Sequence, residues 1–327
     1  MTGLSRRQVC AGFAAAASLT ARGRPARAEP LAIRLGYSLA AEEQLWVLMA
    51  DQSLGKNYGK LYTLDATRFT GSSQRAQAFA AGAIDLASSG AEGVLFAAAE
   101  GIPSTIIASI SRESLHHGFN TTFLALDSSP ISKVEDLKGK TVAVNGLSTN
   151  GELWLRTALE RHGMRESDVT VVPVAFPAMA ESLRSGRIDA GEFPQPFDAM
   201  ARKAMKVRTI FTSKEGMPFD EELVVIVGHA AYLKAHAEAI RGFLADLQTA
   251  TKFYLDHPVE ARQLLIDKKF VRVPPDIYLH MEDYYRDPTL HVDVDALKKM
   301  QDIQVSAGFQ KKKADIATLV DLSYLPK

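Results

Sequence analysis

The chain has 327 residues, of which 46% are hydrophobic and 23% charged, and its formal net charge is zero. That length suits two compact domains rather than one core, and the composition excludes a disordered or fibrous chain. Residues 1–28 hold five arginines and no acid, so the remainder has 33 basic and 38 acidic side chains, a net of −5. This acidic remainder argues against nonspecific nucleic-acid binding, which needs clustered lysine and arginine.

The N-terminus has the features of an export signal. Paired arginines in Ser5–Arg7 precede the apolar run Val9–Leu19, and Ala26–Ala28 supplies small residues for cleavage. We predict a twin-arginine-like signal peptide over residues 1–28, with the general secretory route and a basic amphipathic arm as alternatives. Cys10 is the only cysteine and lies inside this segment. Removal of the signal would therefore leave no disulfide and no thiol nucleophile.

Strands and helices alternate through the first part of the chain. Period-2 alternation of apolar residues predicts strands, and a 3.6-residue period predicts helices. The expected strands are 32–36, 62–69, 84–88 and 104–110, and the expected helices are 42–51, 72–81 and 91–100. This order indicates an α/β fold with parallel strands.

A second series begins near Asp127. Its expected strands are 141–145, 169–174, 188–192 and 207–211, with helices at 150–162, 177–185 and 196–203. One further strand is expected at 223–227, and the remainder is predicted to be helical at 237–256, 259–268, 275–285 and 295–306.

A short motif occurs once in each series. Gly82-Ala83-Ile84-Asp85 has its counterpart in Gly186-Arg187-Ile188-Asp189. The glycine suits the C-terminal cap of a helix, because it accepts the left-handed conformation needed there. The repeat predicts two lobes of similar topology.

Ligands of open α/β sheets bind beyond the carboxyl ends of the strands, so the strand-to-helix turns are the candidate binding segments. Four of these turns are rich in small polar residues: 37–38, 70–73, 88–90 and 147–150. Ser89 with Glu92, and Thr149 with Glu152, have the spacing of a capping box. Free N–H groups at such helix starts favour an anionic or carbonyl-bearing ligand. The alternative is that these are simply well-capped helices.

Several aromatic residues have two interpretations. Phe193 and Phe197 are candidates for an apolar wall of the site, with Gln195 as a polar contact, or else Phe193 is part of the core. Trp46 and Trp154 lie on apolar helix stripes and are predicted to pack in the core.

The sequence contains no H-E-x-x-H, P-loop, G-x-S-x-G or dinucleotide-binding pattern, and His116-His117 lacks metal-binding spacing. No catalytic residue, cofactor or metal is therefore predicted. An enzyme is not excluded on this ground, since catalytic groups can be scattered along a chain.

A set of segments resembles a known family. The segments are Ile33–Tyr37, Gly82–Asp85, Gly101–Pro103, Asp136–Val144, Gly186–Ala190 and Pro196-Phe197. Together they are similar to the periplasmic substrate-binding proteins of the aliphatic sulfonate, taurine and nitrate ABC importers. One branch of that fold makes the thiamine pyrimidine with clustered cysteines, which this chain lacks.

The resemblance implies a type II periplasmic binding fold, with two α/β lobes and a ligand cleft between them. One lobe would hold 31–125 with 221–327 and the other 126–220, joined by hinges near 126–127 and 219–222. The implied ligand contacts are Tyr37, Ser38, Thr70, Ser72, Ser89, Gly90, Ser148, Thr149, Asn150 and Phe193.

The function that follows is capture of a small organic anion, such as a sulfonate, a nitrate-like ion or an aromatic or carboxylic acid. The receptor is expected to be a periplasmic monomer that uses no cofactor and docks on an ABC permease in the inner membrane. The alternatives are an exported two-domain enzyme (a decarboxylase or hydrolase) and the effector-binding half of a transcription regulator.

Overall fold

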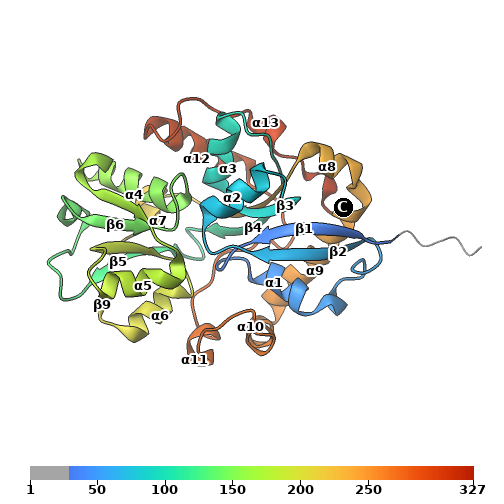
Figure 1. Cartoon of the computed structure of the whole chain (residues 1–327), viewed down its shortest axis with the longest axis horizontal. Coiled ribbons are helices and arrows are strands. Elements are labelled where there is room, and N and C mark those ends of the chain that lie inside the picture. Colours follow the sequence, from blue (N-terminus) through green and yellow to red (C-terminus); the bar gives the residue numbers. More distant parts are fainter. Residues whose placement is uncertain (1–28) are drawn as a thin grey trace, which may run out of the picture.

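The computed structural model describes residues 29–327, so the predicted signal at 1–28 lies outside the described residues. Ten strands form two five-stranded sheets, ordered β2-β1-β3-β10-β4 and β7-β6-β8-β5-β9. Figure 1 shows the second sheet with its helices on the left and the first sheet on the right. The strand order β2-β1-β3 in the first sheet has its counterpart in β7-β6-β8 in the second. This is the similar topology that the repeated motif predicts.

The strands of the first sheet are β1 (Leu31–Tyr37), β2 (Tyr62–Arg68), β3 (Leu86–Gly90), β4 (Thr105–Glu113) and β10 (Glu221–Gly228). Those of the second sheet are β5 (Thr122–Leu126), β6 (Thr141–Val144), β7 (Thr170–Pro173), β8 (Ala190–Phe193) and β9 (Val207–Thr212). The expectation of parallel strands holds only in part. β10 runs antiparallel to β3 and β4, and β5 runs antiparallel to β8 and β9.

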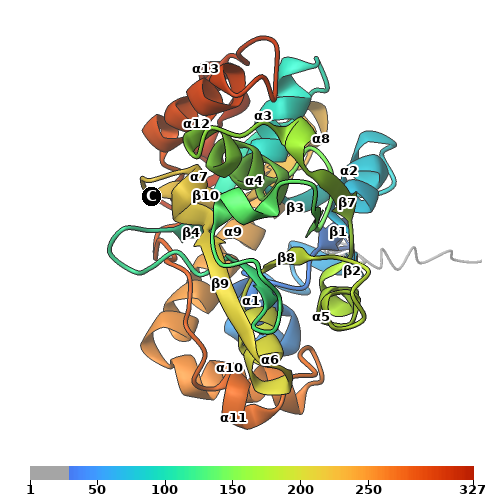
Figure 2. The same cartoon turned by 90° about the vertical axis from the view of Figure 1, so that its left-hand side faces the viewer.

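The helices that precede β10 in the chain are α1 (Glu43–Ala50), α2 (Ser72–Ala80), α3 (Ala91–Ala99), α4 (Asn150–Arg161), α5 (Phe176–Arg184), α6 (Phe197–Ala204) and α7 (Ser213–Gly216). The C-terminal part adds α8 (Ala230–Ala235), α9 (Ala237–Asp256), α10 (Pro258–Asp267), α11 (Pro275–Tyr278), α12 (Val294–Ser306) and α13 (Ile316–Leu319). Short 3-10 helices lie at Gln52–Leu54, Val134–Leu137, Glu166–Asp168 and Leu322–Tyr324. Figure 2 shows α11 beside α6, where Lys203 pairs with Asp276.

The repeated motif occupies equivalent places in the two sheets. Gly82 and Gly186 follow α2 and α5 with φ of 68° and 72°, so the predicted glycine caps are confirmed. Asp85 then accepts a hydrogen bond from the backbone N–H of Arg34 in β1 at 3.0 Å. Asp189 accepts from Thr141 N in β6 at 2.8 Å. Each aspartate therefore ties the start of one strand to its parallel neighbour.

The structure differs from the sequence-based expectations at several elements, of which β5 and the segment 275–285 are two. The strand β5 was not predicted, because its five residues, Thr-Phe-Leu-Ala-Leu, show no alternation. The helix expected over 275–285 ends at Tyr278. Its continuation is irregular, because the buried Arg262 Nη1 bonds the carbonyls of Leu279 and Met281 at 3.2 and 3.1 Å.

The chain passes between the sheets twice, over 114–121 and 213–220. It enters the second sheet at Thr122, rather than at the expected residue 126. The two passages lie against each other, since Ser213 N donates to Thr121 O at 3.0 Å. Buried Glu113 holds the first passage by accepting from the N–H groups of Asn120 and Thr121.

We call residues 29–113 with 221–327, around the first sheet, the first half, and residues 122–212, around the second sheet, the second half. One apolar core runs through both halves, and a smaller cluster around Phe193 and Met179 lies in the second half. Among residues 29–327, no helix is both long enough and apolar enough to span a membrane.

Candidate functional site

A pocket of about 70 Å³ lies between the two sheets, and we call it the central pocket. Its lining comes from both halves of the chain: Ser38, Ala40, Ala41, Glu42, Ser72, Arg75, Gly90, Thr121, Asn145, Thr149, Asn150, Gly151, Trp154, Phe176, Glu192, Pro194, Leu223, Val224 and Tyr284. A water molecule occupies about 30 Å³ of liquid, so this space suits one small oxyanion group.

Four helices begin at the wall of the central pocket. Glu42, Gly90 and Thr149 are the N-cap residues of α1, α3 and α4, and Ser72 is the first residue of α2. Each helix start presents unpaired N–H groups and the positive end of its dipole. Their convergence on one small space favours a negatively charged group there.

Arg75 supplies a full positive charge to the same space. It comes from α2, is 4% exposed, and packs beside Gly36 of β1. Its Nε is buried without a hydrogen-bond partner, and no carboxylate of residues 29–327 lies within ion-pairing distance, 4.0 Å. Burial lowers the pKa of Arg75, although nearby Glu42 offsets part of this effect. A buried unpaired cation is costly, and that cost is recovered when an anion binds.

Two acidic side chains share the pocket wall. Glu42 accepts from Ser38 N at 3.0 Å and from Ser88 Oγ at 2.7 Å, so its carboxyl group is engaged with the protein. Glu192 accepts from Asn145 N at 2.8 Å. Burial raises the pKa of Glu192 to about 7, and the hydrogen bond from Asn145 lowers it in part. Near neutral pH Glu192 is therefore often protonated and able to donate a hydrogen bond.

The predicted contact residues fall into several places. Five of them line the central pocket: Ser38, Ser72, Gly90, Thr149 and Asn150. Ser89 and Ser148 line a neighbouring pocket of about 410 Å³, and Thr70 lines another of about 420 Å³.

Two predicted contacts lie elsewhere. Phe193 is fully buried in the smaller core, which agrees with the second interpretation of this residue. Tyr37 is buried and lines none of these three pockets, and its hydroxyl accepts from Arg68 Nε at 3.4 Å.

Neither capping box forms. Ser89 lies in β3, and Gly90 is the N-cap of α3, while the Glu92 carboxyl is buried without a partner. Thr149 is the N-cap of α4 as predicted, but its hydroxyl donates to Gly146 O at 2.6 Å. Glu152 accepts from Ser148 N rather than from the cap. The helix N–H groups at these two turns are thus not consumed by side-chain caps.

Direct contacts join the two halves beside the pocket. Asn150 Nδ2 donates to Leu223 O at 3.3 Å, and a Cβ at Gly90 would lie 2.1 Å from Asn150 Oδ1. Trp154 Nε1 donates to Glu221 Oε2 at 3.2 Å. Trp154 is buried, as predicted, but it also lines the pocket.

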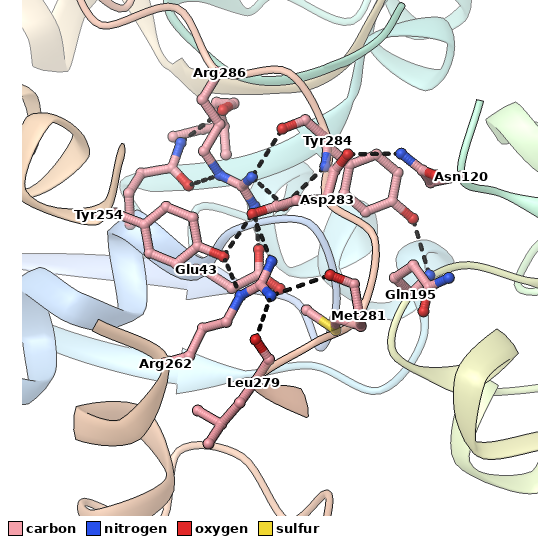
Figure 3. Close-up of polar contacts among 12 residues, drawn as sticks. Glu43, Asn120, Gln195, Tyr254, Arg262, Leu279, Met281, Asp283, Tyr284 and Arg286 are labelled. Carbon is pink, nitrogen blue, oxygen red and sulfur yellow. Dashed lines mark hydrogen bonds and ion pairs between the residues drawn. The ribbon is translucent and has the colours of Figure 1, made fainter. Parts of the chain in front are cut away.

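Tyr284 links the pocket to a buried charge cluster (Figure 3). Its hydroxyl accepts from Gln195 N at 3.0 Å. The adjoining Asp283 pairs with Arg262 at 2.9 Å and with Arg286, and its backbone carbonyl accepts from Asn120 Nδ2 at 2.6 Å. Residues of the first half, the passage and the second half are thereby held together.

The main pocket residues that the sequence analysis missed are Arg75, Glu42, Glu192, Asn145 and Tyr284. All except Tyr284 lie within a few residues of a polar turn or strand end that was singled out. Asn145 closes the predicted strand 141–145, and Glu192 closes 188–192. Polar residues at strand ends were the available signal. Tyr284 had none, because it comes from a segment predicted to be helical.

Comparisons with known proteins agree with this geometry. The family model described as NMT1/THI5 like matches residues 64–261. The taurine-binding periplasmic protein of Escherichia coli (strain K12) is 26% identical over 232 residues, covering 71% of this chain and 69% of that protein. The formylaminopyrimidine-binding protein of Halalkalibacterium halodurans is 28% identical over 193 residues, covering 58% and 56%.

The alkanesulfonate-binding protein SsuA from Xanthomonas axonopodis pv. citri, bound to MOPS, superposes with a TM-score of 0.75 at 19% identity. The match covers 90% of this chain and 99% of that structure. The predicted type II periplasmic binding fold is confirmed by this likeness.

Proposed function

The chain belongs to the NMT1/THI5-like family of substrate-binding proteins, and we propose that it captures a small organic anion in the central pocket. It is a solute-binding component of an ABC import system and acts by binding rather than by turnover, as its curated relatives are binding proteins. The names of those relatives give ligands of different chemistry, taurine and a formylaminopyrimidine. The ligand class is therefore argued from the pocket itself.

The observation that carries the proposal is the unpaired guanidinium of Arg75 among four helix N-termini. A neutral ligand would leave this charge buried without compensation. An oxyanion such as sulfonate or carboxylate accepts from Arg75 and from backbone N–H groups together. A protonated Glu192 adds one more donor.

The two sheets are proposed to be the cores of two lobes that close on the ligand. The passages 114–121 and 213–220 would serve as the hinge, close to the sequence-based boundaries. Asn150 and Trp154, which contact the opposite half, support a closed arrangement of the lobes. Ligand biases closure only by binding the closed state better than the open one. Because the pocket lining comes from both halves, each half alone offers an incomplete site.

The place of action is also part of the proposal. The taurine-binding relative is periplasmic, and the predicted twin-arginine-like signal would bring this chain to the same compartment. There it would act as a monomer and deliver its ligand to a permease in the inner membrane.

The test is a substitution of Arg75 by methionine, which keeps length and removes charge. Titration calorimetry would measure methanesulfonate, taurine, nitrate, benzoate and an uncharged pyrimidine. We expect at least one anion to bind the wild type, and the Arg75→Met variant to bind it about a hundredfold more weakly. Loss of one partner of a buried charge pair typically costs about 2–5 kcal/mol of binding free energy.

The matched control is Arg184→Met, which removes an exposed arginine from α5. It should leave affinity unchanged. Binding of the pyrimidine with no response to any anion would contradict the proposal, as would equal anion affinity in the wild type and Arg75→Met.

A further inference from the structure

A second, larger pocket of about 420 Å³ adjoins the central pocket, and we call it the aromatic pocket. Its lining is mostly apolar: Ser38, Leu39, Trp46, Arg68, Thr70, Phe176, Pro177, Ala180, Pro196, Phe197, Met200, Phe270, Val271, Arg272 and Val273. A dry cavity of about 150 Å³ is enough to hold benzene. The aromatic pocket therefore has room for more than one ring.

The aromatic pocket lies beside the central pocket, because Ser38 and Phe176 line both. A ligand with its anionic head at Arg75 would place an attached ring past these two residues. The lining comes from both halves of the molecule. Phe176 and Phe197, at the starts of α5 and α6, stack with ring centroids 5.5 Å apart, and Phe270 and Val271 come from the segment after α10. The apolar wall predicted around Phe197 is thus formed with Phe176 in place of Phe193.

Three further features suit an anion with an apolar body. Phe197, Met200 and Phe270 are only partly buried, so apolar surface is left for a ligand to cover. Trp46 is 3% exposed, and its indole N–H is buried without a partner. Arg68 and Arg272 are exposed on the same lining, and their charge favours the approach of an anion.

We propose that the aromatic pocket is a subsite for the aromatic body of the ligand, so that the protein selects aryl sulfonates or aryl carboxylates over small oxyanions. This inference rests on the proposed function, because the anionic head would lie at Arg75. Affinity would come from burial of the rings between the two halves. The same burial would hold the halves closed.

The experiment compares methanesulfonate with naphthalene-2-sulfonate, which have the same anionic head and differ only in the apolar body. Calorimetry on the wild-type protein should give an affinity for naphthalene-2-sulfonate about a hundredfold higher than that for methanesulfonate. Arg75→Met should weaken both ligands, because both would use the same guanidinium.

Two variants fill the aromatic pocket from opposite sides, Met200→Trp on α6 and Val271→Trp after α10. Each should reduce the affinity advantage of naphthalene-2-sulfonate over methanesulfonate from about a hundredfold to about tenfold or less. An unchanged melting temperature without ligand shows that each variant is folded. Two variants from different segments guard against a folding defect in one of them.

The outcomes separate this inference from the proposed function. Methanesulfonate binding with no advantage for the aryl ligand overturns the subsite and leaves the anion site standing. An aryl advantage that survives both filling variants also overturns the subsite. Failure of both sulfonates and of the other anions to bind overturns both proposals.

Discussion

The protein buries arginines in two regions, and the regions differ in what surrounds the charge. In the charge cluster of Figure 3, Arg286 pairs with Glu43 and Asp283, and its guanidinium lies 4.7 Å from the Tyr254 ring centre. Burial alone would lower the pKa of Arg286, but Asp283, Tyr254 and Glu43 outweigh it and raise that pKa. Every side of this cation has a partner.

In the central pocket the same residue type is buried with little compensation. Arg75 has no hydrogen-bonded carboxylate within residues 29–327, and burial lowers its pKa. The difference teaches how to separate structural from ligand-binding charges. Arg286 is satisfied by the fold and stabilises it, whereas the Arg75 side chain has no ion-pair partner within residues 29–327, as the proposed anion site requires. Burial alone does not distinguish a structural arginine from a ligand-binding one. The distinguishing feature is whether the guanidinium has hydrogen-bond and ion-pair partners within the protein.

The largest expected effect separates the two arginines by stability. Arg286→Met leaves the buried Glu43 without its ion-pair partner and removes one of the two arginines that pair with Asp283, which should cost about 3–5 kcal/mol of unfolding free energy. Arg75→Met should change the unfolding free energy by less than about 1 kcal/mol, because the Arg75 side chain makes no hydrogen bond within residues 29–327. Urea denaturation of ligand-free protein measures both. Equal losses in the two variants would break the comparison.

A smaller effect is expected from the acidic residue of the central pocket. The pKa of Glu192 is raised from 4.5 to about 7 by burial, so the folded protein holds a proton that the unfolded chain releases. Stability from this group is complete below about pH 4.5 and is lost as pH rises toward about 7 and beyond. The loss amounts to about 3 kcal/mol at most.

Glu192→Gln removes that titration and keeps the shape of the side chain. The unfolding free energy of the variant should fall less steeply between pH 4.5 and 7 than that of the wild type. Glu181→Gln, an exposed glutamate on α5, is the control and should follow the wild type. Parallel curves for the wild type and Glu192→Gln would show that Glu192 is not protonated in the fold.

The smallest effect concerns the link between the two regions. Tyr284→Phe removes the acceptor of Gln195 N and the contact with Thr121 Oγ1 at 3.4 Å. The unfolding free energy should drop by about 1 kcal/mol. The neighbouring, half-buried Tyr285 serves as a control, and Tyr285→Phe should have a smaller effect. No loss from Tyr284→Phe would mean that the hydroxyl does not couple the cluster to the pocket.

Most of the secondary structure was predictable, because alternation and helical stripes are local. The expected strand 32–36 lies within β1, which is one residue longer at each end. The expected helix 237–256 has the same bounds as α9. β5 was missed because four of its five residues, 123–126, form a continuous apolar run without period-2 alternation. The helix over 275–285 was overpredicted because the competing donor, Arg262, is distant in the sequence.

The candidate site was predictable only as a set of turns. Strand ends meet at one edge of a sheet, so Ser72, Gly90 and Thr149 were correctly expected to come together. Which side chains are buried there depends on tertiary packing. Arg75 is one turn into a helix and has the spacing of an ordinary surface cation. Tyr284 comes from the segment between α11 and α12, which follows the last strand of the chain. Neither has a local pattern.

The position of β10 has a consequence for synthesis. The second sheet is built from one continuous stretch, 122–212, whereas β10, which pairs with β3 and β4, is made only after that stretch. The first sheet cannot be completed when β3 and β4 emerge from the ribosome. Their partner β10 begins over 100 residues after the end of β4 and has not yet been synthesised. Pairings of such long range are slow to form. The second sheet is therefore expected to fold before the first sheet is complete. β3 and β4 can pair with β10 only after residue 228 has been added.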